Sequence, residues 1–121
     1  MHRELGPGLT ESVYETILAA KLERIGYTVD RQRPIDVEYD GLRFKAAFRI
    51  DLLVENRLLV EIKSIEKLSA VHAKQLLTYL RLTNQPVGLL INFGGTTLRE
   101  GFRRLVNNHV PSAPPRLCAN N

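Results

Sequence analysis

The sequence predicts a mixed α/β or α+β fold, in which helices pack against one sheet. Two observations lead to this class. Segments with the apolar period of a helix alternate with apolar segments of strand length that are bounded by turn residues. Their order along the 121 residues is helix, several strands, helix, strand, helix. The early strands are joined by short turns and should be antiparallel, whereas the strand after the second helix should lie parallel to a neighbour.

The first helix is expected from Glu11 to about Ile25. It follows the breaker "GPG", and Thr10 stands where a capping side chain is favoured. Gly26 then ends the helix, as glycine often does at this position. The next eighteen residues, "YTVDRQRPIDVEYDGLRF", should be extended, with a hairpin turn at Asp40–Gly41.

Two strands are expected next, from about Phe44 to Val54 and from about Leu58 to Lys63. Ser69 can cap a second helix that reaches about Leu82. The segment "PVGLLINFG" is typical of a short buried strand, and "TLREGFRRLVN" is expected to form a third helix that Gly101 weakens. Residues 1–109 are therefore interpreted as a single domain and residues 110–121 as a Pro-rich, loose tail.

The composition is that of an ordinary soluble globular domain, with 44% hydrophobic and 25% charged residues. No apolar run has the length of a membrane span, and the N-terminal residues lack the apolar core of a signal peptide. Cys118 is the only cysteine, which excludes a disulfide framework and a thiolate metal cluster. A cytoplasmic protein is the simplest interpretation.

The charge balance is basic, with a net charge of +4 and a pI of about 9.5. Twelve of the seventeen basic residues are arginine, whose guanidinium suits bidentate contacts with phosphate. A nucleic-acid partner is compatible with this balance, although many basic proteins bind none.

Charged residues interrupt the two apolar stretches of "RIDLLVENRLLVEIK". Because side chains alternate along a strand, Glu61 and Lys63 share one face. A three-residue loop at Glu55–Arg57 would pair Asp51 with Glu61 on that face. A two-residue loop at Asn56–Arg57 would place Asp51 on the opposite face.

With the three-residue loop, the two carboxylates would lie roughly 5 Å apart. They would repel, and one would take up a proton unless a cation lay between them. Mg²⁺ is commonly held by one or two carboxylates together with water and phosphate oxygens. Lys63 could then orient a water or stabilise charge on a phosphate. The alternative is a plain salt bridge between Lys63 and the acids.

Gln75 and Tyr79 are four residues apart and share one face of the second helix, with His72 beside them. We expect this face to lie over the side of the sheet that carries Lys63. Gln75 could hold a water or a nucleotide edge, and Tyr79 could pack or bind phosphate. The same spacing is also typical of ordinary surface and core residues. His72 is better interpreted as a polar helix residue than as a metal ligand, because no second histidine lies at ligand spacing.

The first helix carries two acids near its start. Glu11 lies in the first turn, where an acid favours the helix dipole whatever its function. Glu15 is expected further round the helix, toward solvent.

Three of these patterns resemble one protein superfamily. Asp51 with "EIK" at 61–63 is similar to the active-site core of the PD-(D/E)XK nucleases, and "QLLTY" at 75–79 resembles the Q-x3-Y element of their RecB-like branch. The segment "GLTESVY" at 8–14 matches the small bacterial and archaeal GxxExxY family, as do the closing segments "GLLINFG" and "LREGFRRLVN". The resemblance covers roughly residues 4–107.

The resemblance implies a restriction-endonuclease-like αβββαβ core, with a mixed sheet flanked by helices, and a phosphodiesterase site that depends on Mg²⁺ or Mn²⁺. Asp51 and Glu61 would be the metal ligands. The remaining catalytic residues would be the first-helix acid, the catalytic lysine and the supporting helix pair: Glu11, Lys63, Gln75 and Tyr79. Members usually have a further helical segment before the point where this chain starts, so a truncated chain would expose apolar surface.

Two functions follow from these residues. The first is a metal-dependent nuclease that hydrolyses phosphodiester bonds, with DNA as the expected substrate. The second is a nucleic-acid-binding or accessory module that keeps the fold and cleaves little or not at all. The intact set of Asp51, Glu61 and Lys63 favours the nuclease. A homodimer is compatible with either function.

Overall fold

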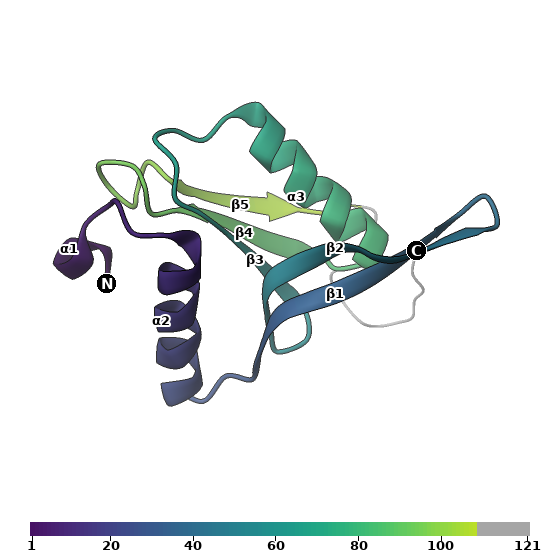
Figure 1. Ribbon diagram of the computed structural model, residues 1–121, viewed down its shortest axis with the longest axis horizontal. Coiled ribbons are helices and arrows are strands. Elements are labelled where there is room, and N and C mark those ends of the chain that lie inside the picture. The colour runs from purple at the N-terminus through teal and green to yellow at the C-terminus, as the bar shows by residue number, and fades with distance from the viewer. Residues whose placement is uncertain (109–121) are drawn as a thin grey trace.

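The computed structural model describes residues 1–108, and its five strands form one sheet in the order β1-β2-β3-β4-β5. Helices α2 and α3 lie on opposite faces of this sheet (Figure 1). The β3–β4 pair is parallel and the other three pairs are antiparallel. The mixed α+β prediction is confirmed, and the arrangement agrees with a restriction-endonuclease-like core. The elements are α1 (His2–Leu5), α2 (Glu11–Arg24), β1 (Val29–Tyr39), β2 (Leu42–Val54), β3 (Leu58–Lys63), α3 (Ala70–Thr83), β4 (Val87–Asn92) and β5 (Phe102–Val106).

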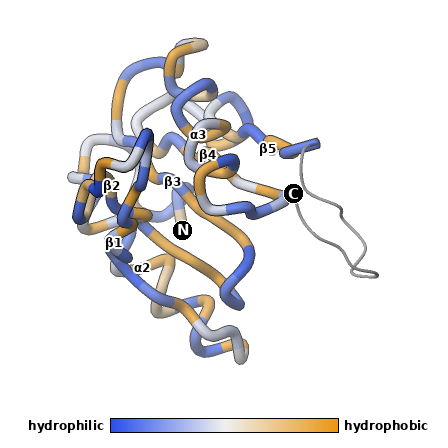
Figure 2. The backbone as a smooth tube through the Cα atoms, turned by 90° about the vertical axis from the view of Figure 1, so that its right-hand side faces the viewer, coloured by the Kyte–Doolittle hydropathy of each residue, from blue (hydrophilic) through white to orange (hydrophobic). Residues whose placement is uncertain are grey.

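Two apolar layers hold the helices to the sheet. Because side chains alternate along β3, Val60 and Ile62 pack on the α2 side, whereas Leu59 packs on the α3 side. On the α2 side, Tyr14 is fully buried and stacks on Phe93 with ring centroids 4.5 Å apart. Hydrophobic and hydrophilic stretches accordingly alternate along the chain in Figure 2. The sheet is thus buried on both faces around β3, the strand that carries Glu61 and Lys63.

Both predicted hairpin turns are present. Asp40 and Gly41 have positive φ angles of 53° and 79°, and Tyr39 pairs with Leu42 across the turn. The second turn is the three-residue loop Glu55–Arg57, so that Val54 pairs with Leu58. The loop length required for Asp51 and Glu61 to face each other is therefore confirmed.

The predicted third helix is wrong, because "TLREGFRRLVN" forms a turn followed by β5, which pairs with β4. The Gly101 carbonyl accepts a hydrogen bond from the Asn92 amide at 2.8 Å, and a Cβ at Gly101 would collide with the Asn92 backbone. The chain can therefore fold back tightly onto β4. The spacing of Phe102 and Val106 is compatible with a helix and with a strand. The strand forms because the open edge of β4 supplies hydrogen-bond partners for its backbone.

The second helix begins as predicted. The Ser69 backbone amide donates to His72 Nδ1 at 3.0 Å, so His72 supports the start of α3. The predicted tail at 110–121 lies outside the described residues. In the part of the chain that the structure describes, no helix is both long and apolar enough to span a membrane.

Candidate active site

Asp51 and Glu61 lie just beyond the point where the pairing of β2 with β3 ends, at Leu52 and Val60. Each carboxylate accepts a hydrogen bond from a backbone amide of the region opposite. Asp51 Oδ2 accepts from the Ile62 amide at 2.8 Å, and Glu61 Oε1 accepts from the Asp51 amide at 3.3 Å. Two acidic side chains are thereby fixed side by side where the strands stop pairing.

The pair is electrostatically strained. Glu61 is only 6% exposed, and burial, followed by the negative charge of Asp51, raises the pKa of Glu61 to about 8. The pKa of Asp51 is raised as well, first by burial and then by the nearby charges of Glu15 and Glu11. Hydrogen bonds from Ile62 and Gln32 offset only part of this effect. A bound cation would relieve the excess negative charge of this cluster.

The donor set fits a hard divalent cation. Within residues 1–108, no group of three or more His, Cys, Asp or Glu side chains is arranged to hold a metal. Asp51 and Glu61 could therefore supply only part of a coordination shell. Mg²⁺ suits such a site, because it keeps several waters and takes further oxygens from substrate phosphates. A closed four-ligand zinc site has no counterpart in this part of the chain.

Lys63 is the last residue of β3 and is half-buried. Alternation places it on the same face as Glu61, and its positive charge lowers the pKa of that carboxyl against the larger effects that raise it. Lys63 forms no ion pair with any residue in the described range. The salt-bridge alternative is therefore not what the structure contains, and the amine remains available to a substrate.

One member of the predicted helix pair, Tyr79, lies close enough to the carboxylates for their charges to raise its pKa. Tyr79 stacks on Phe48 with ring centroids 4.0 Å apart, and burial raises the pKa of its hydroxyl, with further contributions from the charges of Glu61 and Asp51. The Gln75 side chain is exposed and forms no hydrogen bond within residues 1–108.

Glu15 does not face solvent, so the prediction for this residue is wrong. It is 5% exposed and lies under β1, where Arg31 Nε donates to Oε2 at 3.0 Å and Gln32 Nε2 donates to Oε1 at 2.6 Å. Glu11 remains exposed at the start of α2, and its carboxylate accepts a long hydrogen bond of 3.4 Å from the Ser64 amide, directly after β3. Both acids are close enough to raise the pKa of Asp51.

Gln32 is a site residue that the sequence analysis missed. On β1, Arg31 pairs with Leu52 and Arg33 pairs with Ile50, so Gln32 lies opposite Asp51. Its Nε2 donates to Asp51 Oδ1 at 3.2 Å and also to Glu15. Its φ angle is +50°, a conformation that costs a non-glycine residue about 1–3 kcal/mol and tends to occur at functional sites. No sequence signal marks it, because its role depends on a strand register and a backbone irregularity.

Comparison with known proteins agrees with this geometry. Searches of curated proteins and of solved structures found no match. A family model described as the PD-(D/E)XK nuclease superfamily matches residues 1–105, which is most of the chain. With its mixed sheet and with an acid pair and a lysine on adjacent strands, the chain belongs to the PD-(D/E)XK nuclease superfamily.

Proposed function

We propose that this protein is a metal-dependent nuclease that hydrolyses phosphodiester bonds in DNA. Membership of the superfamily supports a nuclease-type function in general. The observation that carries the specific proposal is the pair of carboxylates, Asp51 and Glu61, both with raised pKa, beside a lysine, Lys63, that shares a face of β3 with Glu61 and lowers its pKa. Such a pair is unfavourable in an isolated fold and becomes favourable with a cation and a phosphate beside it.

In this proposal, Asp51 and Glu61 hold Mg²⁺ or Mn²⁺. The ion, when bound, supplies a Lewis acid for the phosphate and lowers the pKa of a water. Lys63 donates a hydrogen bond to the phosphate or to the attacking water, which stabilises the negative charge that develops during cleavage. Tyr79, whose hydroxyl stays protonated because its pKa is raised, can serve as a second donor at the same face.

A second group of side chains positions Asp51. The Gln32 amide bridges Asp51 and Glu15, so that the Asp51 carboxylate is held from β1 as well as from β3. Arg31 neutralises Glu15, which limits the repulsion that this third acid adds. Partners of this kind orient metal ligands and commonly affect metal affinity. Glu11, at the edge of the site, contributes negative charge there.

The charge distribution supports a polyanionic substrate. Residues 57–108 contain eight basic and three acidic side chains, a net charge of +5, whereas residues 1–56 contain eight basic and ten acidic side chains, a net charge of −2. The basic half includes β3 and α3, which carry Lys63, Lys74 and Arg81. Lysine and arginine side chains around a nuclease site contact the backbone phosphates of the substrate.

We further propose that the chain is a GxxExxY member of the RecB-like branch and acts in the cytoplasm. Its Tyr14 hydroxyl donates to the Gly6 carbonyl and accepts from the Leu9 amide, so this tyrosine fastens the segment that precedes Glu11. That role gives a physical reason for a tyrosine at this position, one helical turn after Glu11.

Supercoiled plasmid, linear DNA and single-stranded RNA incubated with Mg²⁺, Mn²⁺ or EDTA would test the function. The wild type should nick DNA with either metal and not with EDTA, and Glu61→Gln, which keeps the side-chain shape, should be inactive. Cleavage in EDTA or by Glu61→Gln would refute the proposed site. If the wild type cleaves RNA and not DNA, the substrate is RNA. A wild type that binds DNA and does not cut it would favour the accessory module.

A further inference from the structure

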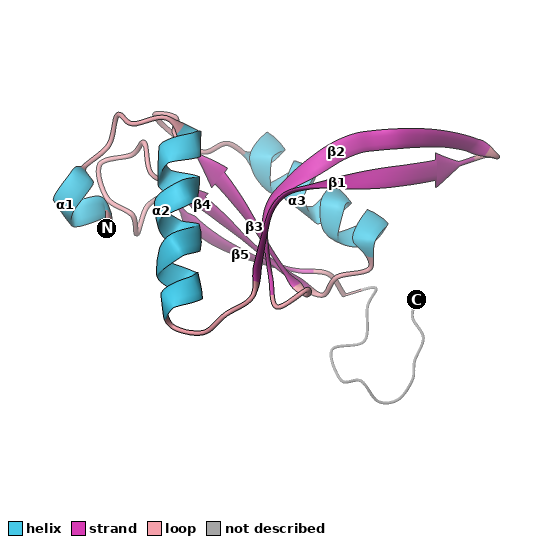
Figure 3. Cartoon of the chain, turned by 60° about the horizontal axis from the view of Figure 1, so that its bottom comes forward, coloured by secondary structure: helices cyan, strands magenta, loops and turns pink. Residues whose placement is uncertain are grey.

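The distal half of the β1–β2 hairpin, here called the arm (residues 36–45), projects beyond the helices and the other strands (Figures 1 and 3). The register of the hairpin shifts between Ile35 and Val37, where the arm begins. Asp36 fixes this irregularity, because its carboxylate accepts from the Ala46 amide at 2.9 Å and from Arg43 at 3.2 Å. The arm is therefore a shaped element and not a frayed turn.

One face of the arm is apolar and uncovered. Val37 pairs with Phe44 and Tyr39 pairs with Leu42, and paired residues of an antiparallel ladder point to the same side. Tyr39, Leu42 and Phe44 are 75%, 61% and 49% exposed. An isolated two-stranded hairpin is marginally stable in water, so a projecting hairpin with this composition gains stability when its apolar face is covered.

The charge of the arm argues against nucleic acid as its partner. Residues 36–45 contain Asp36, Glu38 and Asp40 against Arg43 and Lys45, a net charge of −1. Arg43 is already paired with Asp36. An acidic element is repelled by a phosphate backbone, so the partner should be an apolar protein surface with basic residues near it.

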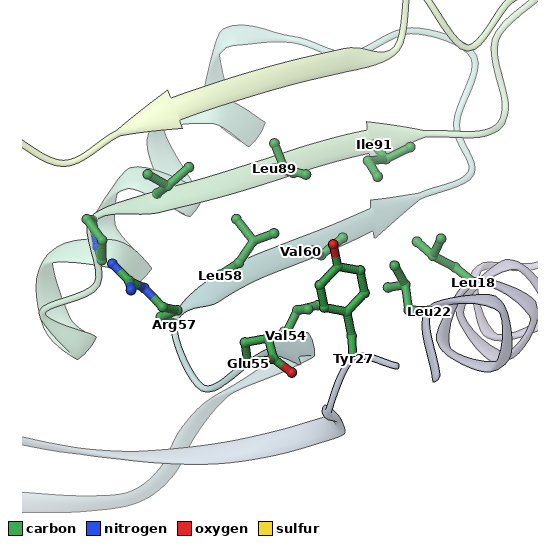
Figure 4. Close-up of a pocket in the computed structure, with 12 residues that line it drawn as sticks. Leu18, Leu22, Tyr27, Val54, Glu55, Arg57, Leu58, Val60, Leu89 and Ile91 are labelled. Atoms are coloured by element: carbon green, nitrogen blue, oxygen red, sulfur yellow. The ribbon is translucent and has the colours of Figure 1, made fainter. Parts of the chain in front are cut away.

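The same chain carries such a surface. A groove of about 540 Å³ lies between α2 and the strands β2, β3 and β4 on the α2 side of the sheet. In Figure 4, the side chains of Leu58 and Leu89 project from β3 and β4, with Tyr27 and Leu22 beside them. Apart from Glu55 and Arg57, its lining is apolar or aromatic: Leu18, Leu22, Tyr27, Val54, Leu58, Val60, Pro86, Val87, Leu89 and Ile91.

The rim of the groove complements the arm in charge. The Glu55 carboxylate already accepts a hydrogen bond from the Thr28 amide at 2.6 Å. Arg57 has no ion pair in the portion of the chain that the structure describes. Asp40, at the tip of the acidic arm, can therefore pair with Arg57 of another molecule while the apolar face enters the groove.

We propose that the arm of one copy of this chain inserts into the groove of a second copy, and that the exchange is reciprocal. The contact area favours reciprocity. Large aromatic side chains bury roughly 150–250 Å² each, so the partly exposed face of one arm supplies roughly 400 Å². A standard interface needs about 800 Å² per partner. Each copy reaches that area when it contributes both its arm and its groove, in a closed twofold dimer.

Light scattering on a size-exclusion column, with a dilution series by sedimentation, tests the dimer independently of any cleavage. The wild type should be dimeric. Tyr39→Ser combined with Phe44→Ser should weaken dimerisation by roughly 100-fold or more, because two large anchors are lost. Its circular dichroism should not change, since both side chains are exposed. Val71→Ser removes an exposed apolar side chain of α3 and should leave the dimer intact.

Disulfide trapping then tests which surfaces meet. In a Cys118→Ser background, a mixture of Tyr27→Cys and Leu42→Cys should cross-link between copies on oxidation, and a mixture of Tyr27→Cys and Val71→Cys should not. A wild type that stays monomeric at every concentration overturns the proposal. So does a dimer that survives the arm substitutions, or equal cross-linking in both mixtures. In those cases another segment or another protein covers the groove.

Discussion

Asp36 and Asp51 lie in the same β1–β2 hairpin, and each accepts a hydrogen bond from a backbone amide of the neighbouring strand. Asp36 accepts from Ala46 at 2.9 Å and Asp51 accepts from Ile62 at 2.8 Å. The pKa of Asp36 is nevertheless lowered, first by that hydrogen bond and then by Arg43, whereas the pKa of Asp51 is raised, first by burial. The backbone contact alone thus says little about the role of an aspartate.

The difference between the two lies in their surroundings. Asp36 is exposed to solvent beside the Arg43 guanidinium, so its negative charge is stabilised. Its role is to shape the arm. Asp51 is half-buried beside Glu61 and near Glu15 and Glu11, so its charge is unfavourable unless a cation joins the cluster. Perturbed carboxylates of this kind are candidates for function, whereas satisfied carboxylates are not.

The largest expected effect separates these two aspartates. Asp51→Asn should lower metal-dependent cleavage by more than about 100-fold, because even partners that only orient a metal ligand affect metal sites by 10–100-fold. Asp36→Asn, the matched control, should cleave like the wild type. A plasmid-nicking time course measures both, and equal activity of the two variants would erase the distinction between them.

The next effect concerns Lys63. Lys63→Ala should lower turnover by roughly 100- to 1,000-fold, as expected for loss of one donor that stabilises developing charge. Its Mn²⁺ affinity should be retained, because the amine acts on phosphate and water and not on the cation. Single-turnover cleavage combined with Mn²⁺ titration measures the two quantities. Loss of Mn²⁺ binding in this variant would mean that Lys63 maintains the site structurally.

A smaller effect is expected at Gln32. Gln32→Gly removes the amide that holds Asp51, and glycine adopts the φ of +50° without strain. Mn²⁺ affinity should fall by about 10-fold, toward the low end for partners of metal ligands, and the melting temperature should fall because the buried Glu15 carboxylate also loses a hydrogen bond. Gln32→Ala should bind Mn²⁺ as weakly as Gln32→Gly and should melt at a lower temperature than Gln32→Gly, because alanine is strained at this φ. Wild-type affinity in both variants would refute a positioning role.

The smallest effect is expected at Gln75. Gln75→Ala removes an exposed side chain that contributes at most a neutral hydrogen bond to the substrate, worth about 0.5–1.5 kcal/mol. Cleavage should therefore fall by no more than roughly tenfold. A steady-state assay over substrate concentration is sufficient, and a loss as large as that of Asp51→Asn would place Gln75 at the reacting phosphate.

Much of the fold, including the three-residue loop between β2 and β3, could be predicted from the sequence because local rules govern it. The three-residue loop at Glu55–Arg57 determines which residues face each other, and alternation then sets the faces of Glu61 and Lys63. Spacing on a helix likewise predicted that Tyr79 lies toward the sheet. These inferences depend on neighbours in the sequence.

The features that could not be predicted depend on contacts between distant segments. Glu15 is buried only because β1 brings Arg31 and Gln32 across α2. Gln32 reaches Asp51 only through an irregular backbone at φ +50°. Residues 102–106 fit two periodicities, and the open edge of β4 selects the strand. Sequence spacing carries no information about these tertiary choices.

The central claim is that Asp51 and Glu61, whose negative charges repel each other, together bind one divalent cation. Calorimetric titration with Mn²⁺, repeated in buffers of different ionisation enthalpy, tests it most directly. With a pKa of about 8, Glu61 is mostly protonated at pH 7 and must lose its proton to bind metal. The wild type should therefore bind one Mn²⁺ with release of about one proton, and its affinity should rise from pH 6 to pH 8. Binding without proton release, or binding that Asp51→Asn leaves unchanged, would contradict the account.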